Sequence, residues 1–146
     1  MKRLTLLLFA VLVPIVGYVV GYSSAQQQVE RKGTASTIKL EWVMSSHLTE
    51  LNGKYKLQVT EITFVPGGYV SQHDHAGPGI RYIVSGELTF VGEGKTTTYK
   101  KGDYFYESGD TTNSASNKTK SPTVVLNFEL LPADWKGGSA IPPKKK

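Results

Sequence analysis

Residues 67–86 read GGYVSQHDHAGPGIRYIVSG, and this stretch decides the fold. It holds His73 and His75, two of the three histidines of the chain. Side chains alternate along a strand, so two imidazoles spaced two residues apart point to the same face. Glycine-rich turns at 66–68 and 77–79 flank the pair. The stretch therefore predicts a β-hairpin that carries both imidazoles on one face.

The spacing within this stretch resembles the first motif of the cupin family. Gly67 is followed by five residues and then by the His73-x-His75 pair, and Gly86 comes eleven residues after His75. The family places a glutamate ligand seven residues before that last glycine, where this chain has Gly79. The resemblance implies a small antiparallel jelly-roll barrel, a fold that in this family usually holds one metal ion.

Residues 102–117, GDYFYESGDTTNSASN, resemble the second cupin motif, which has a glycine, a Pro-x-Gly turn, a histidine ligand and an asparagine. Gly102 and Asn117 fit at the family's spacing. The turn is replaced by residues 108–110, and Asn113 stands where the histidine is expected. Two of the four usual metal ligands are therefore missing, so the resemblance predicts the fold more strongly than the chemistry.

Composition and turn spacing also favour strands. The 146 residues include 15 glycines and no cysteine, with 39% hydrophobic and 20% charged residues, which fits one globular domain without disulfides or thiol chemistry. No amphipathic helix is evident. Strands are expected at 38–44, 55–65, 88–91, 95–100, 104–107 and 121–131. Together with the resemblance, these runs predict an all-β, antiparallel jelly-roll (cupin) barrel.

The N-terminus predicts export. Residues 1–25 have the features of a signal peptide, with a helical apolar run (4–22) after Lys2 and Arg3, and small residues at 23–25. The protein is then periplasmic or secreted. The alternative is an uncleaved anchor over residues 4–22, because 19 residues approach the ~20 that span a bilayer. Membrane contact is expected only through this leader.

The rest of the chain divides into a polar linker (26–37), the barrel (38–132) and a tail rich in Pro, Gly and Lys (133–146). The net charge is +5; without the two basic residues of the leader, 15 basic and 12 acidic residues leave +3. No basic patch with interleaved aromatics is visible, so no nucleic-acid partner is expected. The resemblance implies a homodimer as one arrangement, since cupins commonly pair.

His73 and His75 are the candidate metal ligands, because neutral imidazoles bind Fe, Mn, Zn and Ni. Asp110 is the nearest carboxylate of the second motif and would complete a facial triad of two histidines and one acid. However, Asp110 is three residues from Asn113, so strand parity places it on the opposite face, where it would cap a turn. Asp74 is expected to face outward, and His47 to lie in a surface loop.

Arg81 changes the expected charge of the pocket. It is two residues from Gly79 and so shares the face on which the family's glutamate would point. An arginine suits carboxylate or phosphate, so Arg81 and Asn113 are the candidate ligand-binding residues of an anion pocket. The alternative is an Arg81 at the barrel rim that pairs with a surface acid. The motifs fix no acid on this face unless Asp110 turns inward.

Three functions follow. The first is an exported single-domain cupin that binds a small molecule, an anion if Arg81 is free, beside a partial metal site at His73 and His75. The alternative is a metal-dependent enzyme, similar to the family's dioxygenases, isomerases or lyases, that uses both histidines and a carboxylate. The second alternative is a non-catalytic interaction scaffold. With Gly79 and Asn113 at ligand positions, metal binding should be weaker than in a complete cupin site.

Overall fold

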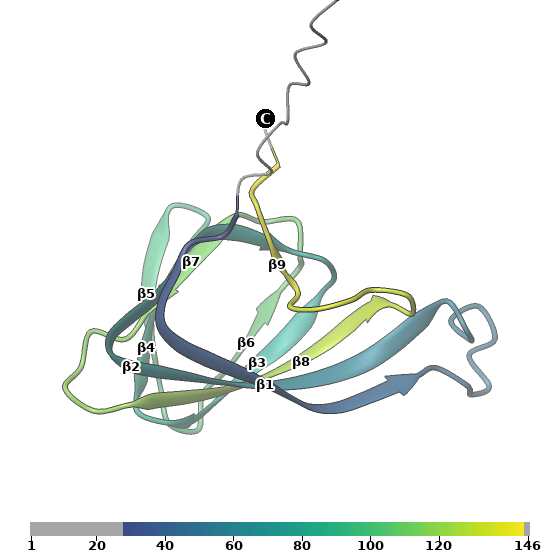
Figure 1. Ribbon diagram of the computed structural model, residues 1–146, viewed down its shortest axis with the longest axis horizontal. Helices are drawn as coiled ribbons and strands as arrows, with labels where there is room; N and C mark the ends of the chain where they lie inside the picture. Colours follow the sequence, from purple (N-terminus) through teal and green to yellow (C-terminus); the bar gives the residue numbers. More distant parts are fainter. Residues whose placement is uncertain (1–27, 145–146) are drawn as a thin grey trace, which may run out of the picture.

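The computed structural model describes residues 28–144, which form an open antiparallel β-barrel (Figure 1). The expected signal helix at residues 1–25 lies outside the described residues. The nine strands are β1 (Arg31–Val43), β2 (Tyr55–His75), β3 (Gly79–Ser85), β4 (Glu87–Gly92), β5 (Lys95–Lys100), β6 (Tyr104–Glu107), β7 (Asn113–Ser116), β8 (Thr123–Pro132) and β9 (Ala140–Ile141). Between residues 28 and 144, no helix is long and apolar enough to cross a membrane.

Strand β2 connects the two halves of the barrel. Its first half pairs with β8, and its second half pairs with β7, within the strand order β5-β4-β7-β2-β8-β3-β6. The turn expected at 66–68 does not end the strand, so that expectation was wrong. Proline and glycine interrupt regular pairing without stopping the chain here, and Gly67 has a φ of 74°. The Pro-Gly-Gly segment therefore marks the point where β2 changes from pairing with β8 to pairing with β7.

Strand β1 begins at Arg31 rather than at residue 38, so most of the described part of the expected linker lies in a strand. It pairs with β2 and extends past the barrel as an arm, which ends in the turn at 44–54 (Figure 1). Nearly every residue of β1 is exposed. A strand open to solvent along most of its length does not need the apolar alternation of a half-buried strand. That exposure explains why residues 31–37 resemble a linker in sequence.

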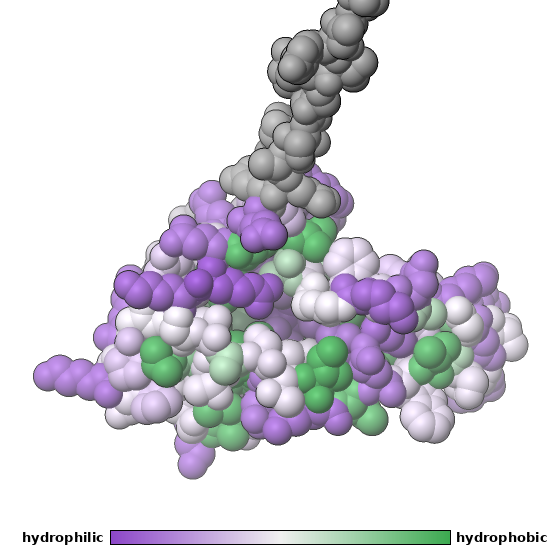
Figure 2. All heavy atoms as spheres, in the orientation of Figure 1, coloured by the Kyte–Doolittle hydropathy of each residue, from purple (hydrophilic) through white to green (hydrophobic). Residues whose placement is uncertain are grey.

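The hydrophobic core lies inside the barrel, between the two halves of the sheet. Its buried members are Phe64, Val70, Ile83, Leu88 and Val125. Three aromatic rings add to it from the side of β4, β5 and β6, with Tyr99 stacked on Phe105 at 4.1 Å and Phe90 5.0 Å from Phe105. Outside, hydrophilic residues cover much of the face seen in Figure 2, and hydrophobic residues form separate patches. The core therefore fills one part of the barrel and leaves the other to polar side chains.

The C-terminal segment crosses the mouth of the barrel (Figure 1). Strand β9 pairs with the end of β2, where Ile141 lies opposite Asp74 and Ala140 opposite His75. The backbone amide of Lys144 donates a hydrogen bond of 3.0 Å to the Asp74 carboxylate. Part of the tail rich in Pro, Gly and Lys is therefore attached to the strand that carries the histidine pair.

Candidate ligand-binding site

His73 and His75 face the barrel interior, as the sequence predicts. Both are buried, and both line the same cavity. Nδ1 of His73 donates to the Ser71 carbonyl at 2.7 Å, which leaves Nε2 as an acceptor. That Nε2 lies 3.1 Å from Nε2 of His75. The two rings therefore meet through the nitrogens that point into the cavity.

Burial keeps His73 neutral. Loss of water around the ring lowers the pKa of His73 to about 4, and the hydrogen bond to Ser71 offsets only part of this effect. The neighbouring His75 lowers the pKa of His73 further. At neutral pH His73 is thus an uncharged acceptor toward the cavity.

Arg81 points inward but is not free. It is 2% exposed, its Nε contacts the Glu107 carboxylate, and its Nη2 donates to Oε1 of Glu129 at 3.0 Å. The expectation that no acid shares this face was wrong, because two do. The guanidinium is therefore already neutralised by the chain, and the surface-rim alternative for Arg81 is also wrong.

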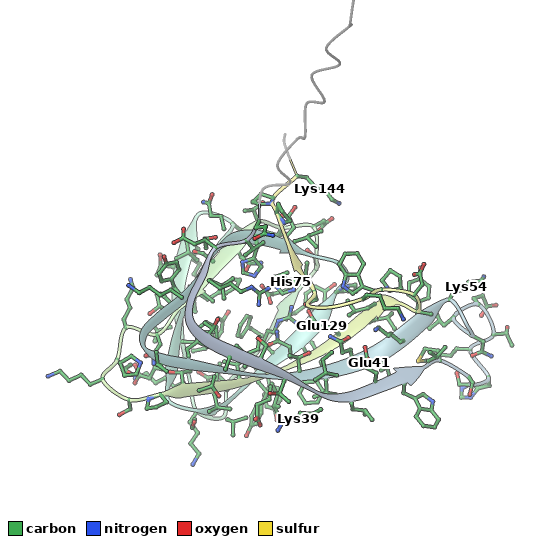
Figure 3. All side chains as sticks on the ribbon, viewed as in Figure 1. Lys39, Glu41, Lys54, His75, Glu129 and Lys144 are labelled. Atoms are coloured by element: carbon green, nitrogen blue, oxygen red, sulfur yellow. The ribbon has the colours of Figure 1, made fainter. Side chains whose placement is uncertain are left out.

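Both glutamates also contact His75. Its Nδ1 lies 3.0 Å from Glu129 Oε1, and its Nε2 lies 3.5 Å from Glu107 Oε2. In Figure 3 the labelled His75 and Glu129 lie together in the middle of the barrel, beside the C-terminal segment.

Glu129 is held as a carboxylate. Burial alone would raise the pKa of Glu129, but the hydrogen bond from His75 and the charge of Arg81 outweigh it, so the pKa lies below its usual value. Ser139, on the segment before β9, donates a further hydrogen bond of 2.6 Å to Glu129. Ser139 thereby connects the C-terminal segment, which forms the roof of the pocket, to the charged cluster. This cluster consists of His75, Arg81, Glu107 and Glu129.

The two glutamates could have been found from strand parity. Glu107 lies opposite Gly79 in the β3–β6 pairing, and Arg81 lies opposite Phe105, so both β6 residues share the inner face. On β8, alternate residues from Thr123 onward face inward, and Glu129 is one of them. The imperfect alternation of this strand thus reflects polar residues that face the cavity.

The remaining candidates divide between the interior and the surface. Asn113 lies opposite His73 in the β2–β7 pairing, is buried and lines the cavity. Asp110 is exposed and accepts a hydrogen bond from Ser108, as expected of a turn residue. Asp74 points away from the cavity but is buried under the C-terminal segment. His47 is exposed in the turn after β1.

The cavity has a volume of about 220 Å³ and two unlike halves. The charged cluster and Asn113 line one half. The other half is apolar and is formed by Phe64, Val70, Leu88, Phe90, Phe105 and Val125. A space of this size with one apolar and one polar wall suits a small amphipathic molecule.

The buried atoms without partners show which hydrogen-bonding groups the polar half of the cavity could bind. Within residues 28–144, four buried side-chain oxygens have no hydrogen-bond partner. Among the buried side-chain nitrogens of these residues, Nη1 of Arg81 alone lacks one. The oxygens are Gln58 Oε1, Glu107 Oε1, Asn113 Oδ1 and Glu129 Oε2. Buried polar atoms need partners, so this wall has a surplus of acceptors. It is complementary to a molecule that donates hydrogen bonds.

The side chains do not fit the metal that the cupin resemblance implies. Two imidazole nitrogens face each other, but one of the candidate carboxylates, Glu107, is bound by Arg81. Among the residues described, no group of three or more His, Cys, Asp or Glu is arranged to hold a metal ion. Asn113 offers only an amide oxygen, a poor match for metals that prefer imidazole. The histidine pair therefore lies beside a fixed positive charge, without a third His, Cys, Asp or Glu arranged to complete a metal site in the part of the chain that is described.

The fold and interior cavity define a class, the small jelly-roll barrels that enclose a pocket. The family model for the cupin domain (Cupin_2) matches residues 60–129. No curated protein matches the chain in sequence. Residues 60–129 therefore match the cupin domain, and the solved structures below share its fold.

Three solved structures illustrate the likeness. A cupin superfamily protein from Desulfitobacterium hafniense is 15% identical, with a TM-score of 0.52 over 70% of this chain and 81% of that chain. A cupin domain from Bordetella pertussis is 18% identical, with a TM-score of 0.51 over 69% and 96%. The polyketide cyclase RemF from Streptomyces resistomycificus is 15% identical, with a TM-score of 0.54 over 76% and 72%. At these identities the likeness shows the fold alone.

Proposed function

We propose that this cupin binds a small amphipathic molecule inside the barrel, and that the molecule presents a hydrogen-bond donor or a positive charge to the polar wall. The observation that carries the proposal is the set of four unpaired buried oxygens beside an apolar wall. A carboxylate ligand would face those oxygens and two glutamates. An ammonium or hydroxyl group would supply the missing donors.

The charge of the interior supports this ligand class over an anion. Arg81 forms ion pairs with Glu107 and Glu129, so its positive charge is already balanced by carboxylates of the chain. An added carboxylate would have to displace one of them. The earlier expectation of an anion pocket depends on a free Arg81. The binding roles of Arg81 and Asn113 stay predictions, with Asn113 now an acceptor rather than a donor.

The test compares molecules that share a ring and differ in the polar group. Benzylammonium, benzyl alcohol and benzoate are added to the untagged protein at fixed pH and ionic strength, and the melting temperature is recorded. At ten times its Kd, a ligand stabilises by about 1.4 kcal/mol, which raises Tm by roughly 5 °C for a domain of this size. We expect this shift with benzylammonium, a smaller one with benzyl alcohol and none with benzoate.

Asn113→Leu removes one unpaired oxygen and keeps a similar volume. It should reduce the response to benzylammonium, whereas Gln72→Leu, on the exposed face of the same strand β2, should leave it unchanged. Stabilisation by benzoate in place of benzylammonium would establish the anion pocket instead. A flat profile for all three probes would reject this ligand class.

Metal-dependent catalysis is the second candidate, and one observation favours it. Two nitrogens bound to one metal at about 2.1 Å lie roughly 3.0–3.4 Å apart, and the Nε2 atoms of His73 and His75 are 3.1 Å apart. Elemental analysis of protein purified without a metal-binding tag decides the matter. Stoichiometric metal would support an enzyme, and its absence would favour the binding role.

Export and pairing are part of the proposal. We propose that the domain acts outside the cytoplasm, on the strength of the sequence of residues 1–25. Intact-mass measurement of the exported protein should show a chain that begins at Gln26, and a mass that retains the leader would indicate the anchored form. The homodimer stays a prediction, which sedimentation of the purified domain tests directly.

A further inference from the structure

Arg81 occupies the centre of the charged cluster. Its guanidinium contacts Glu107 through Nε and Glu129 through Nη2, and Nη2 lies 3.2 Å from Nδ1 of His75. A Cβ atom on Gly79 would overlap Nη1 of Arg81. The guanidinium therefore fills the space that a side chain at residue 79 would require.

Three roles of a bound cation are already performed by this side chain. A metal ion neutralises buried carboxylates, orients an imidazole and fills the space between its ligands. Arg81 is paired with both glutamates, and through Glu129 it helps to set the orientation of His75. It is also 2% exposed, and so belongs to the barrel interior rather than to the mouth.

We infer that Arg81 is a resident cation that takes the place of a metal ion in this barrel and keeps metal out. Its charge is permanent, because a guanidinium does not lose its proton in proteins. It acts against metal in two ways: it holds Glu107, the carboxylate that approaches Nε2 of His75, and it repels a divalent cation placed beside it. The inference concerns metal alone and does not depend on the organic ligand proposed above.

The decisive variant is Arg81→Met, which keeps an unbranched side chain and removes the charge. Glu107 is then free to join His73 and His75 as a third ligand, a set of two imidazoles and one carboxylate. Untagged wild-type and variant proteins are freed of metal with a chelator and titrated with Co²⁺. Binding is followed by calorimetry, visible absorption and melting temperature.

We expect wild-type protein to show no cobalt absorption band and no shift in Tm. Arg81→Met should bind one Co²⁺ per chain with an affinity at least about tenfold tighter than wild type, because a ligand is gained and a repelling charge is lost. Its Tm should rise when Co²⁺ is added. Arg81→Lys, which keeps the charge, should behave as wild type, and Arg81→Met/Glu107→Gln should lose the gained affinity.

A second variant covers the case in which Arg81→Met does not fold. Arg81→Met/Glu129→Gln removes one charge of each sign and leaves both histidines and Glu107 in place. It should also bind Co²⁺ more tightly than wild type. Stoichiometric cobalt in the wild type would overturn the inference, and so would a folded variant of either kind that shows no gain. Neither result depends on the benzylammonium titration, so the two proposals fail separately.

Discussion

Gly79 and Arg81 are coupled, because a Cβ atom at residue 79 would overlap Nη1 of Arg81 and lie 2.6 Å from the carbonyl oxygen of Phe128. The backbone oxygen cannot move away cheaply, so even alanine does not fit. The glycine at position 79 and the arginine at 81 are thus two parts of one arrangement.

Gly79→Ala should therefore destabilise the protein by about 1–3 kcal/mol, the usual cost of overpacking. Unfolding in urea measures the change. Gly138→Ala is the matched control, since a Cβ there meets only Arg31 at an ordinary contact distance of 3.6 Å. A loss of the same size in both variants would contradict the steric explanation.

Glu129→Gln should cost about 2–4 kcal/mol, less than the full penalty of an unpaired buried charge, because Glu107 still accompanies Arg81. The measurement is the free energy of unfolding at neutral pH and moderate salt. Glu61→Gln breaks an ion pair with Lys39 in which both side chains are more than a third exposed, and it should cost less than about 1 kcal/mol. Equal losses of unfolding free energy in the two variants would mean that the buried ion pairs of Glu129 stabilise the protein no more than an exposed pair does.

Stability should fall as the pH drops below about 6.5. The pKa of His73 is about 4 in the folded protein, so the unfolded chain takes up the proton first. The contribution of His73 is complete above pH 6.5 and is lost progressively down to about pH 4, amounting to about 3 kcal/mol. Urea unfolding at several pH values should show this slope.

The slope should be reduced in His73→Asn and unchanged in His47→Asn, whose side chain is exposed. The pKa values of Asp74 and Glu129 are also held below their usual range, so their contributions are present above the ordinary carboxyl pKa and are lost only at lower pH. A decline that begins only below pH 4 in wild-type protein would show that His73 is not responsible.

Ser139→Ala should weaken the attachment of residues 133–141, which form the roof of the pocket. The hydroxyl donates to Glu129 at 2.6 Å and lies 3.1 Å from Nδ1 of His75, so its loss leaves a charged acceptor short of one donor. We expect a cost of about 1–3 kcal/mol and faster amide exchange in residues 133–141. Ser121→Ala, at an exposed position, is the control. Unchanged exchange would mean that backbone pairing alone holds the segment.

Much of the fold could be predicted from the sequence, because glycine turns and strand periodicity are local signals. That His73 and His75 share one face followed from their spacing, whereas their inward direction and the place of Asn113 followed from the cupin resemblance. The first part of strand β1, residues 31–37, was harder, since it is exposed and has no apolar pattern. The Pro-Gly-Gly bend in β2 was read as an end because a bend and a turn use the same residues.

The partners of Arg81 could not be predicted from the motifs alone. Glu129 lies 48 residues further along the chain, and only the β3–β8 register brings the two together. Glu107 was overlooked because only Asp110 was considered as the carboxylate of the second motif, although Glu107 lies six residues before Asn113, an even spacing that favours the same face. Counting forward along β6, from Phe105 to Glu107, would have placed the acid inside.

The attachment of the C-terminal segment has a practical consequence for handling the protein. Lys144, two residues before the end of the chain, donates its backbone amide to Asp74, the residue between the two histidines. A polyhistidine tag joined close to Lys144 would thus bring imidazoles near the site whose metal content is measured. A removable tag, or cation exchange at a pH well below the sequence pI of about 9.3, avoids this problem.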